Sequence, residues 1–236
     1  MIETAMILAA GKGTRMRAQA NDPPKPLVTI AGQSLLHRML ARLTAAGVKK
    51  IIINVHHKAD EIEAALADFD AAEILISDER AHLLETGGGV QKALPLLGDA
   101  PFLVANADIL WHENSAAIDA LCAGFSPATM QARLLVAARE KASGYDGSGD
   151  YHMAADGGLR RRGDEDAAFI FAGVQILTPA LFAALPAERV GAAFSLNEIY
   201  DVAERKGALY GCVLDGHWMH VGTPEGRAAA EALMHD

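Results

Sequence analysis

Short apolar runs alternate with amphipathic stretches through the first half of the chain. The apolar runs, several of them rich in β-branched residues, predict buried strands at residues 5–9, 50–55, 73–78 and 101–108. Between them, apolar residues recur at helical spacing, which predicts helices at residues 34–47, 59–69 and 88–97. Alternating strands and helices form parallel sheets with crossover helices. We therefore expect an α/β fold with a doubly wound sheet.

The second half of the chain has longer strands and more polar turns. Strands are predicted at residues 129–140, 167–177 and 209–214, and helices at residues 194–207 and 223–236. Ser195 and Thr223 stand at the N-cap positions of these two helices, and Gly207 stands at the end of the first. No linker, repeat or low-complexity tract interrupts the chain. We expect one domain over residues 1–236, with a mixed, mainly parallel sheet.

Composition and charge disfavour several classes of protein. No apolar run approaches the roughly 20 residues that cross a membrane, and the N-terminal run lacks the basic segment of a signal peptide. The formal net charge of −9 disfavours nucleic acid as a partner, because phosphate backbones bind basic surfaces. Cys122 and Cys212 lie outside any metal-binding spacing, which favours reduced thiols in a cytoplasmic protein. A small anionic ligand is compatible with this charge if a few cations gather locally.

A glycine-rich loop, LAAGKGTRM at residues 8–16, follows the first strand. It lacks the GxxxxGK[ST] spacing of a Walker A loop, and Met16 replaces the third glycine of a dinucleotide-binding GxGxxG loop. Gly11 and Gly13 still allow backbone N–H groups to face an anion, and Arg15 adds a guanidinium that suits phosphate oxygens. The loop therefore predicts a phosphate site, and the alternative is a solvated turn with surface arginines.

Two charged residues are expected beside this loop. Lys25 lies between prolines in PPKPLV, residues 23–28, and the prolines present it on an extended, rigid backbone. Asp108 ends the strand at residues 101–108, and ligands of doubly wound sheets bind outside the carboxyl ends of the strands. Asp108 is therefore a candidate metal ligand. The alternative is that it caps a helix that begins near Asn114.

These motifs together resemble the signature of the sugar-1-phosphate nucleotidyltransferases. LAAGKGTRM and PKPLV are followed, in the family's order, by ETGGGV (85–90), NADI (106–109), FAGVQIL (171–177) and WMHVGTPE (218–225). The resemblance implies a Rossmann-like nucleotide-diphosphosugar transferase fold, with a nucleotide-binding half at residues 1–110 and a sugar-binding half at residues 111–236. It also implies the reaction NTP + sugar 1-phosphate → NDP-sugar + pyrophosphate, with Mg²⁺ as cofactor.

The resemblance further implies a role for each matching residue. The nucleoside would lie on the backbone of Leu8, Ala9, Ala10 and Gly11, with its base and ribose beside Glu85, Thr86, Gly87 and Gly88. The β- and γ-phosphates would bind to Gly13, Thr14 and Arg15, and the α-phosphate and the sugar phosphate to Lys25. The sugar would bind to Asn106, Gly149, Asp150 and Gly173. Arg15, Lys25 and Asp108 are then the catalytic residues, and Asp108 ligates the metal.

The second metal ligand departs from the family pattern. The family's late motif reads W-x-D-V-G-T, and His220 stands here in place of its aspartate. Imidazole is a poor ligand for Mg²⁺, a hard cation that prefers oxygen. Three interpretations stay open. Asp108 and phosphates hold Mg²⁺ with water, His220 binds a softer ion such as Mn²⁺ or Co²⁺, or His220 contacts phosphate.

The likeness along the whole chain is to uridylyltransferases of this family that serve cell-wall recycling, which implies UTP and N-acetylmuramate 1-phosphate as substrates. The carboxylate of that sugar calls for a cation, for which Arg139, Arg160 and Arg161 are candidates, although the charge run at residues 160–167 is otherwise a solvated turn. GTP, CTP or dTTP with mannose, heptose or glucose 1-phosphate is an alternative, as is a non-catalytic regulator that binds a nucleotide sugar. We expect a monomer or a homodimer.

Overall fold

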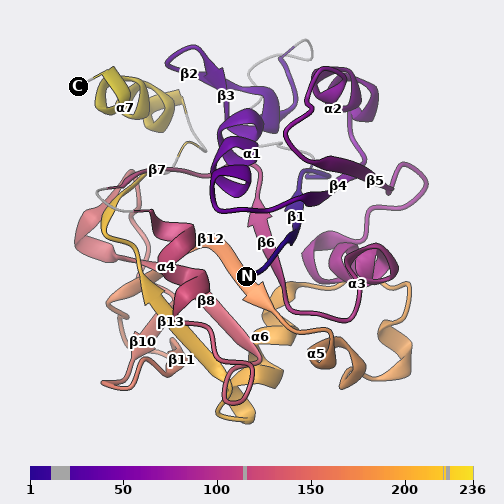
Figure 1. The fold of residues 1–236 in the computed structure, drawn as a ribbon. Coiled ribbons are helices and arrows are strands. Elements are labelled where there is room, and N and C mark those ends of the chain that lie inside the picture. Colours follow the sequence, from indigo (N-terminus) through magenta and orange to yellow (C-terminus); the bar gives the residue numbers. More distant parts are fainter. Residues whose placement is uncertain (12–21, 114–115, 220, 222–223, 236) are drawn as a thin grey trace.

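The computed structural model describes residues 1–11, 22–113, 116–219, 221 and 224–235 of the chain. A nine-stranded sheet runs through it (Figure 1). Four strands form a parallel block in the order β5-β4-β1-β6: β1 (Thr4–Leu8), β4 (Lys50–Val55), β5 (Glu73–Asp78) and β6 (Phe102–Asn106). All four were expected from the apolar runs, because local patterning marks a strand that is buried on both faces.

The long strand β12 (Phe169–Leu177) extends the sheet beyond β6 and runs antiparallel to it. On its other side β12 pairs with β8 (Ala132–Ala138), which pairs in parallel with β13 (Leu209–Val213). The hairpin of β10 (Tyr151–Met153) and β11 (Leu159–Arg161) adds to the sheet at the start of β12. The predicted mixed α/β sheet is confirmed.

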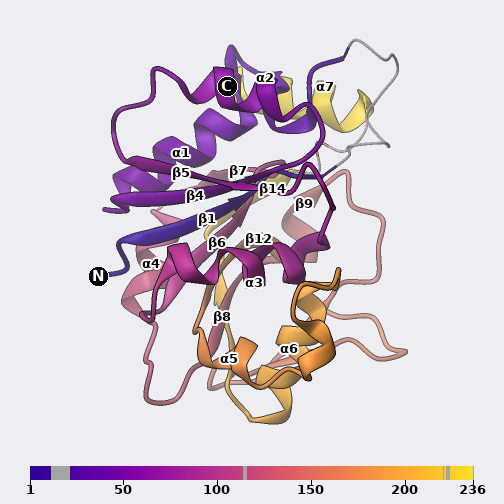
Figure 2. The same cartoon turned by 90° about the vertical axis from the view of Figure 1, so that its right-hand side faces the viewer.

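Helices cover both faces of the sheet, as Figure 2 shows for the parallel block. One face carries α1 (Leu35–Ala45), α2 (Ala59–Leu66) and α4 (Ala117–Ala123), and the other carries α3 (Glu85–Leu97), α5 (Ala180–Ala183) and α6 (Leu196–Arg205). Successive residues of β1 point to opposite faces of the sheet. Ile7 packs in the core beneath α1, α2 and α4, and Met6 packs in the core beneath α3, α5 and α6. No helix within the described residues has the length and apolar character needed to cross a membrane.

Two helices begin at the caps that the sequence predicts. The Ser34 hydroxyl accepts a hydrogen bond from the His37 N–H at 3.2 Å, and the Ser195 hydroxyl accepts one from the Asn197 N–H at 3.2 Å. Beyond the end of α6, Gly207 has a φ of +63°, a conformation that favours glycine after a helix. These helix boundaries are thus set by local chemistry.

A smaller sheet was not expected from the sequence. It consists of β7 (Leu110–Glu113), β14 (Gly216–Met219) and β9 (Ala142–Ser143), in the order β7-β14-β9. A hairpin of β2 (Thr29–Ile30) and β3 (Gln33–Ser34) lies beside the last helix, α7 (Pro224–His235), and Glu231 of that helix accepts a hydrogen bond from the Ala31 N–H at 2.7 Å. The strands of the smaller sheet are short and pair across long stretches of chain, so local patterning does not mark them.

Candidate active site

The carboxyl ends of the central strands form one wall of a pocket of about 250 Å³. Leu8, at the end of β1, pairs with Asn54 of β4 on one side and with Asn106 of β6 on the other. The pocket is lined by Leu8, Ala10, Gly11, Asn54, Leu83, Glu85, Thr86, Asn106 and Asp108. Seven of these nine residues were predicted from the sequence, and Asn54 and Leu83 were not. The fold therefore gathers half of the predicted nucleotide-binding residues in one pocket, together with Asn106 and Asp108.

Asn54 holds the backbone of the glycine-rich loop where the loop leaves β1. Its side-chain Oδ1 accepts hydrogen bonds from the N–H groups of Ala9 and Ala10, at 2.7 and 3.3 Å. The Asn54 amide in turn donates to Glu79 Oε1 at 2.7 Å, and Glu79 Oε2 accepts from the Leu84 N–H at 2.9 Å. Each carboxylate oxygen of Glu79 thus accepts a hydrogen bond at a site where the residue is 0% exposed. Together the two side chains join the glycine-rich loop to the segment before α3.

The glycines at the start of α3 make room for this network and for a neighbouring loop. A Cβ on Gly89 would lie 2.8 Å from Glu79 Oε1. A Cβ on Gly87 would lie 2.4 Å from the Phe194 ring, and the N–H groups of Gly87 and Gly88 both donate to the Phe194 carbonyl. Gly87 and Gly88 are buried there and are absent from the described lining of the pocket, so their predicted contact with the nucleotide stays a prediction.

Helix α3 begins at Glu85, three residues before the predicted start at residue 88. Glycine has a low helix propensity, so sequence patterning misses a first turn made largely of glycine. Glu85 has a φ of +62°, which is rare for a residue other than glycine, and of the three such residues in the described part of the chain it is the one that lines the pocket. Thr86 accepts a hydrogen bond from the Leu196 N–H at 2.9 Å, which ties the pocket to the start of α6.

Lys25 forms an ion pair with Asp108, which lines this pocket. Lys25 Nζ lies 2.5 Å from Asp108 Oδ2, and the two side chains are 16% and 36% exposed. The predicted extended backbone at Lys25 is wrong, because Lys25 opens a short 3₁₀ turn (Lys25–Leu27) between Pro24 and Pro26, both of which are buried. The alternative role of Asp108 as a helix cap is wrong, because α4 begins after Ala116 with no side-chain cap.

A bulge in β12 supports the turn that carries Asp108. Gly173 has a φ of +89°, and the β12–β8 register shifts between Phe171 and Gln175. A Cβ on Gly173 would lie 2.5 Å from Ile109 Cδ1. Gly173 therefore lets β12 approach the residue next to Asp108, and its predicted contact with the sugar stays a prediction.

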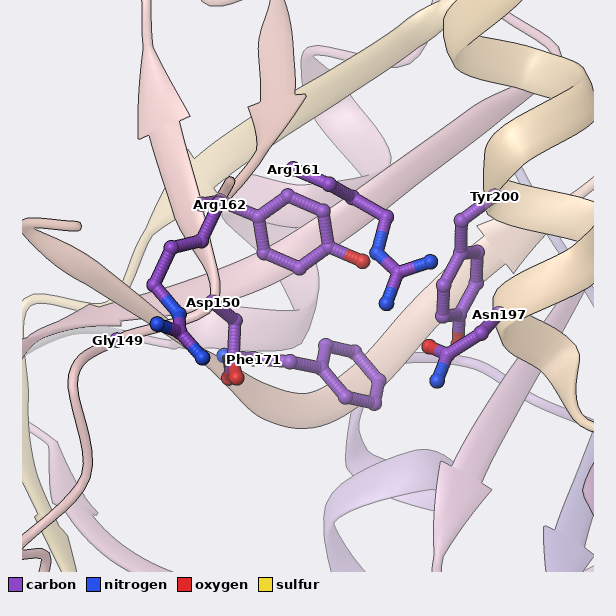
Figure 3. Close-up of a pocket in the computed structure, with 8 residues that line it drawn as sticks. Gly149, Asp150, Arg161, Arg162, Phe171, Asn197 and Tyr200 are labelled. Atoms are coloured by element: carbon purple, nitrogen blue, oxygen red, sulfur yellow. Dashed lines mark hydrogen bonds between the residues drawn. The ribbon is translucent and has the colours of Figure 1, made fainter. Parts of the chain in front are cut away.

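A second pocket, of about 230 Å³, lies between the β10–β11 hairpin, β12 and α6 (Figure 3). It is lined by Gly149, Asp150, Tyr151, Arg161, Arg162, Phe171, Asn197 and Tyr200. Asp150 Oδ2 accepts a hydrogen bond from the Phe171 N–H at 2.8 Å, which fixes this carboxylate at the pocket wall. Burial raises the pKa of the Tyr151 and Tyr200 hydroxyls above the ordinary value, so both are neutral phenols near pH 7. The predicted sugar residues Gly149 and Asp150 thus lie in a polar cavity.

The three candidate arginines for a sugar carboxylate differ in position. Arg139 pairs with Asp166 at 2.8 Å, and Arg160 is exposed and is not part of the pocket lining. Arg161 lines the second pocket but pairs with Asp201 at 2.7 Å. Arg162, which was not singled out from the sequence, also lines this pocket. The only sequence signal for it was the run of three adjacent arginines, which does not tell them apart.

Among the described residues, no group of three or more His, Cys, Asp and Glu side chains could hold a metal ion. Asp108 is the predicted metal ligand that the structure places, and it lines the first pocket. The remaining predicted residues, Gly13, Thr14, Arg15 and His220, lie outside the described part of the chain. The described site is therefore a pocket at a strand edge that Asp108 lines, with Lys25 bound to the Asp108 carboxylate, an arrangement suited to a nucleotide phosphate.

Comparison with known proteins agrees with this class of site. Residues 5–192 match the MobA-like NTP transferase domain. The chain is 43% identical to N-acetylmuramate alpha-1-phosphate uridylyltransferase of Caulobacter vibrioides, over 98% of this chain and 96% of that protein. It is 35% identical to the Neisseria meningitidis protein of the same name, over 97% of each chain. A putative glucose-1-phosphate thymidylyltransferase from Bacillus anthracis has the same fold, with a TM-score of 0.82 over 99% of this chain and 95% of that one, at 14% identity.

The fold and the pocket at its strand edge define a nucleotide-binding α/β transferase. The chain belongs to the family of the MobA-like NTP transferase domain, which spans both the strand-edge pocket and most of the second pocket. The expected membership in a nucleotidyltransferase family is thereby confirmed.

Proposed function

We propose that the protein transfers a uridylyl group from UTP to N-acetylmuramate 1-phosphate, giving UDP-N-acetylmuramate and pyrophosphate. The observation that carries this proposal is the 43% identity to a uridylyltransferase of that specificity over 98% of the chain. A second relative of the same name, 35% identical over 97% of the chain, supports it. In this proposal the enzyme acts in the cytoplasm on sugar released during peptidoglycan recycling, as a monomer or a homodimer.

The chemistry is an in-line displacement at the α-phosphorus. An oxygen of the sugar phosphate forms a bond to this phosphorus, and the bond from the phosphorus to the oxygen that bridges the β-phosphorus breaks. Pyrophosphate leaves with that oxygen and the bonding electron pair. The nucleophile is already anionic, so the reaction needs no general base, and catalysis consists of positioning and charge stabilisation.

Within the described site, Lys25 is the residue suited to stabilise that charge. Its side chain is only 16% exposed, and its ammonium pairs with Asp108, which lines the pocket. Phosphate oxygens would compete with the carboxylate for the ammonium. Lys25 would then bind the α-phosphate and the sugar phosphate, and the Asp108 carboxylate would be freed for a cation.

The donor set at the pocket fits Mg²⁺ held chiefly by phosphate and water. Mg²⁺ prefers oxygen ligands, keeps several waters and often takes only one or two carboxylates from a protein, and Asp108 supplies one that is 36% exposed. When bound, Mg²⁺ would neutralise charge on the phosphates. Arg15, Gly13 and Thr14 are proposed to bind the β- and γ-phosphates. His220 is proposed to lie beside the metal or a phosphate, with Mn²⁺ as a second possible ion.

The remaining assignments concern the nucleoside and the sugar. The backbone of Leu8, Ala9, Ala10 and Gly11 would hold the nucleoside, because Asn54 orients this segment by hydrogen bonds to its N–H groups. Glu85 and Thr86 would contact the base and ribose from the opposite wall of the pocket. Asn106, Asp150 and the second pocket would receive the sugar.

The test is pyrophosphate release with UTP, ATP, GTP, CTP and dTTP, each combined with N-acetylmuramate, N-acetylglucosamine, glucose and mannose 1-phosphates. We expect release with UTP and N-acetylmuramate 1-phosphate. Release with another pair alone would retain the transferase and replace the substrates. No release with any pair, in either Mg²⁺ or Mn²⁺, would favour a regulator that binds nucleotide sugars without catalysis.

A further inference from the structure

The second pocket adjoins the first through two contacts. The Leu196 N–H donates to Thr86 of the first pocket, and the next residue, Asn197, lines the second. Along β12, Phe171 lines the second pocket, and two residues later Gly173 packs on Ile109, the neighbour of Asp108. Neighbouring residues of β12 and of the start of α6 therefore connect the two pockets.

The two arginines of the second pocket differ in whether a carboxylate already pairs with their guanidinium. Arg161 is half-buried and bound to Asp201 at 2.7 Å, so its charge is already matched. Arg162 is exposed, and its side chain forms no hydrogen bond or ion pair with any described residue, while its charge acts at longer range on Asp166, whose pKa is lowered mainly by the hydrogen bond from Arg139 and in part by Arg162. Figure 3 shows Arg161 pointing towards Tyr200, while Arg162 lies on the side of Gly149 and Asp150. Arg162 is thus the arginine whose guanidinium can take an anionic ligand.

The backbone around Arg162 is fixed before any ligand binds. The Arg162 N–H donates to the Asp150 carbonyl at 2.7 Å, which continues the β10–β11 pairing by one residue. Gly149 is also rigid, since its N–H donates to the Tyr145 hydroxyl at 3.0 Å and a Cβ on it would lie 2.2 Å from the Ala167 carbonyl oxygen. With the backbone fixed, only the Arg162 side chain has to become ordered when its guanidinium binds a carboxylate.

The pocket also contains one carboxylate, that of Asp150. Its Oδ2 accepts a hydrogen bond from the Phe171 N–H, and its remaining lone pairs can accept from sugar hydroxyls. The Asn197 amide adds a further donor and acceptor from α6. The lining is therefore suited to a sugar that has both hydroxyls and one anionic substituent.

We infer that the second pocket is the subsite for the carboxylate of the sugar substrate, and that Arg162 binds this carboxylate through its guanidinium. This inference rests on the proposed function and adds to it the residue that selects a sugar acid over a neutral sugar. Arg161, held by Asp201, forms the wall behind the ligand.

The test is a double-mutant cycle on the intact enzyme. The substrates are N-acetylmuramate 1-phosphate and the analogue in which its carboxylate is replaced by a carboxamide, each with UTP, and the enzymes are wild type and Arg162→Ala. We expect Arg162→Ala to raise KM about tenfold or more for the acid, because it removes a charge-assisted hydrogen bond, and to leave KM for the amide within about twofold. The matched control is Arg160→Ala, two residues earlier in the chain, which lies on β11 outside the pocket and should change neither KM.

The outcomes separate the inference from the proposed function. A wild-type enzyme that does not use the acid overturns both. A wild-type enzyme that uses the acid, with an Arg162→Ala variant whose KM rises equally for acid and amide or for neither, overturns the inference alone. If Arg162→Ala fails to fold, Arg162→Gln, which keeps most of the side-chain length, replaces it in the cycle under the same criteria.

Discussion

Asn54 and Glu79 form a buried pair that joins the two loops of the nucleotide pocket. The Asn54 side-chain NH₂ group donates to Glu79 at 2.7 Å, and the Asn54 side-chain oxygen accepts from the Ala9 N–H. The Glu79 carboxylate also accepts from the Leu84 N–H. The exposed fractions of the two side chains are 2% and 0%. Buried groups of this kind are stable only when every donor and acceptor is satisfied. The position of both loops thus depends on one pair of side chains.

Glu79→Gln should therefore weaken the fold. Both oxygens of Glu79 face N–H donors, and a glutamine would turn its own NH₂ group towards one of them. We expect the free energy of unfolding in urea to fall by about 1–3 kcal/mol, with a higher KM for UTP because the glycine-rich loop loses its support. Glu73→Gln, at the exposed start of the same strand β5, is the control and should change stability by less than about 0.5 kcal/mol. An unchanged free energy of unfolding for Glu79→Gln would contradict the role of this pair.

Lys25→Ala and Asp108→Asn should separate activity from stability. A partly exposed ion pair contributes only about 0–1 kcal/mol to folding, whereas loss of one charged group at a transition state costs about 100- to 1,000-fold in rate. We expect both variants to lose at least about 100-fold in kcat/KM for pyrophosphate release with nearly unchanged thermal unfolding. Lys49→Ala breaks a similar 2.5 Å pair, with the exposed Glu3, and is the control that should retain activity. A Lys25→Ala enzyme as active as the control would remove Lys25 from the catalytic residues.

His220→Asp tests whether this position ligates the metal. Aspartate would restore the oxygen ligand that the family motif carries, and oxygen suits Mg²⁺ better than imidazole does. We expect the Mg²⁺ concentration for half-maximal pyrophosphate release to fall several-fold, and the preference for Mn²⁺ over Mg²⁺ to narrow. His82→Asp, an exposed residue that is not part of the pocket lining, is the control. An unchanged metal dependence would show that residue 220 is not a metal ligand.

Gly173→Ala should disturb the turn that carries Asp108. An alanine would need a φ of +89° and would place its Cβ 2.5 Å from Ile109. We expect a loss of at least about 2 kcal/mol in unfolding free energy, together with a lower kcat as Asp108 moves. Gly163→Ala is the matched control, because no atom lies within 4 Å of an added Cβ there. Equal stability of the two variants would refute the packing role of Gly173.

Much of the fold follows from local pattern. The parallel strands were predictable because each is an apolar run bounded by polar residues, and α1 and α6 because their caps and periodicity lie within a few residues of each other. Gly11 and Asp108 were predictable as parts of one site because both follow parallel strands, whose carboxyl ends lie at one edge of the sheet. The small sheet of β7, β14 and β9 was not, because each strand is short and pairs with residues far away in the chain.

Tertiary structure alone decided which side chains do what at that edge. In the sequence Asn54 and Glu79 are separated by 25 residues, and nothing near either one indicates its partner. A glycine in a sequence also does not show what fills the space where its side chain would be, and at Gly87 that space holds the Phe194 ring. Likewise, three adjacent arginines look equivalent until folding pairs Arg161 with Asp201 and leaves Arg162 in the pocket without a salt-bridge partner among the described residues. The sequence by itself determined which chemical groups are available at the site, because motifs are local in the chain. Only the fold decided which residue each group contacts, because those contacts join residues that are far apart in the chain.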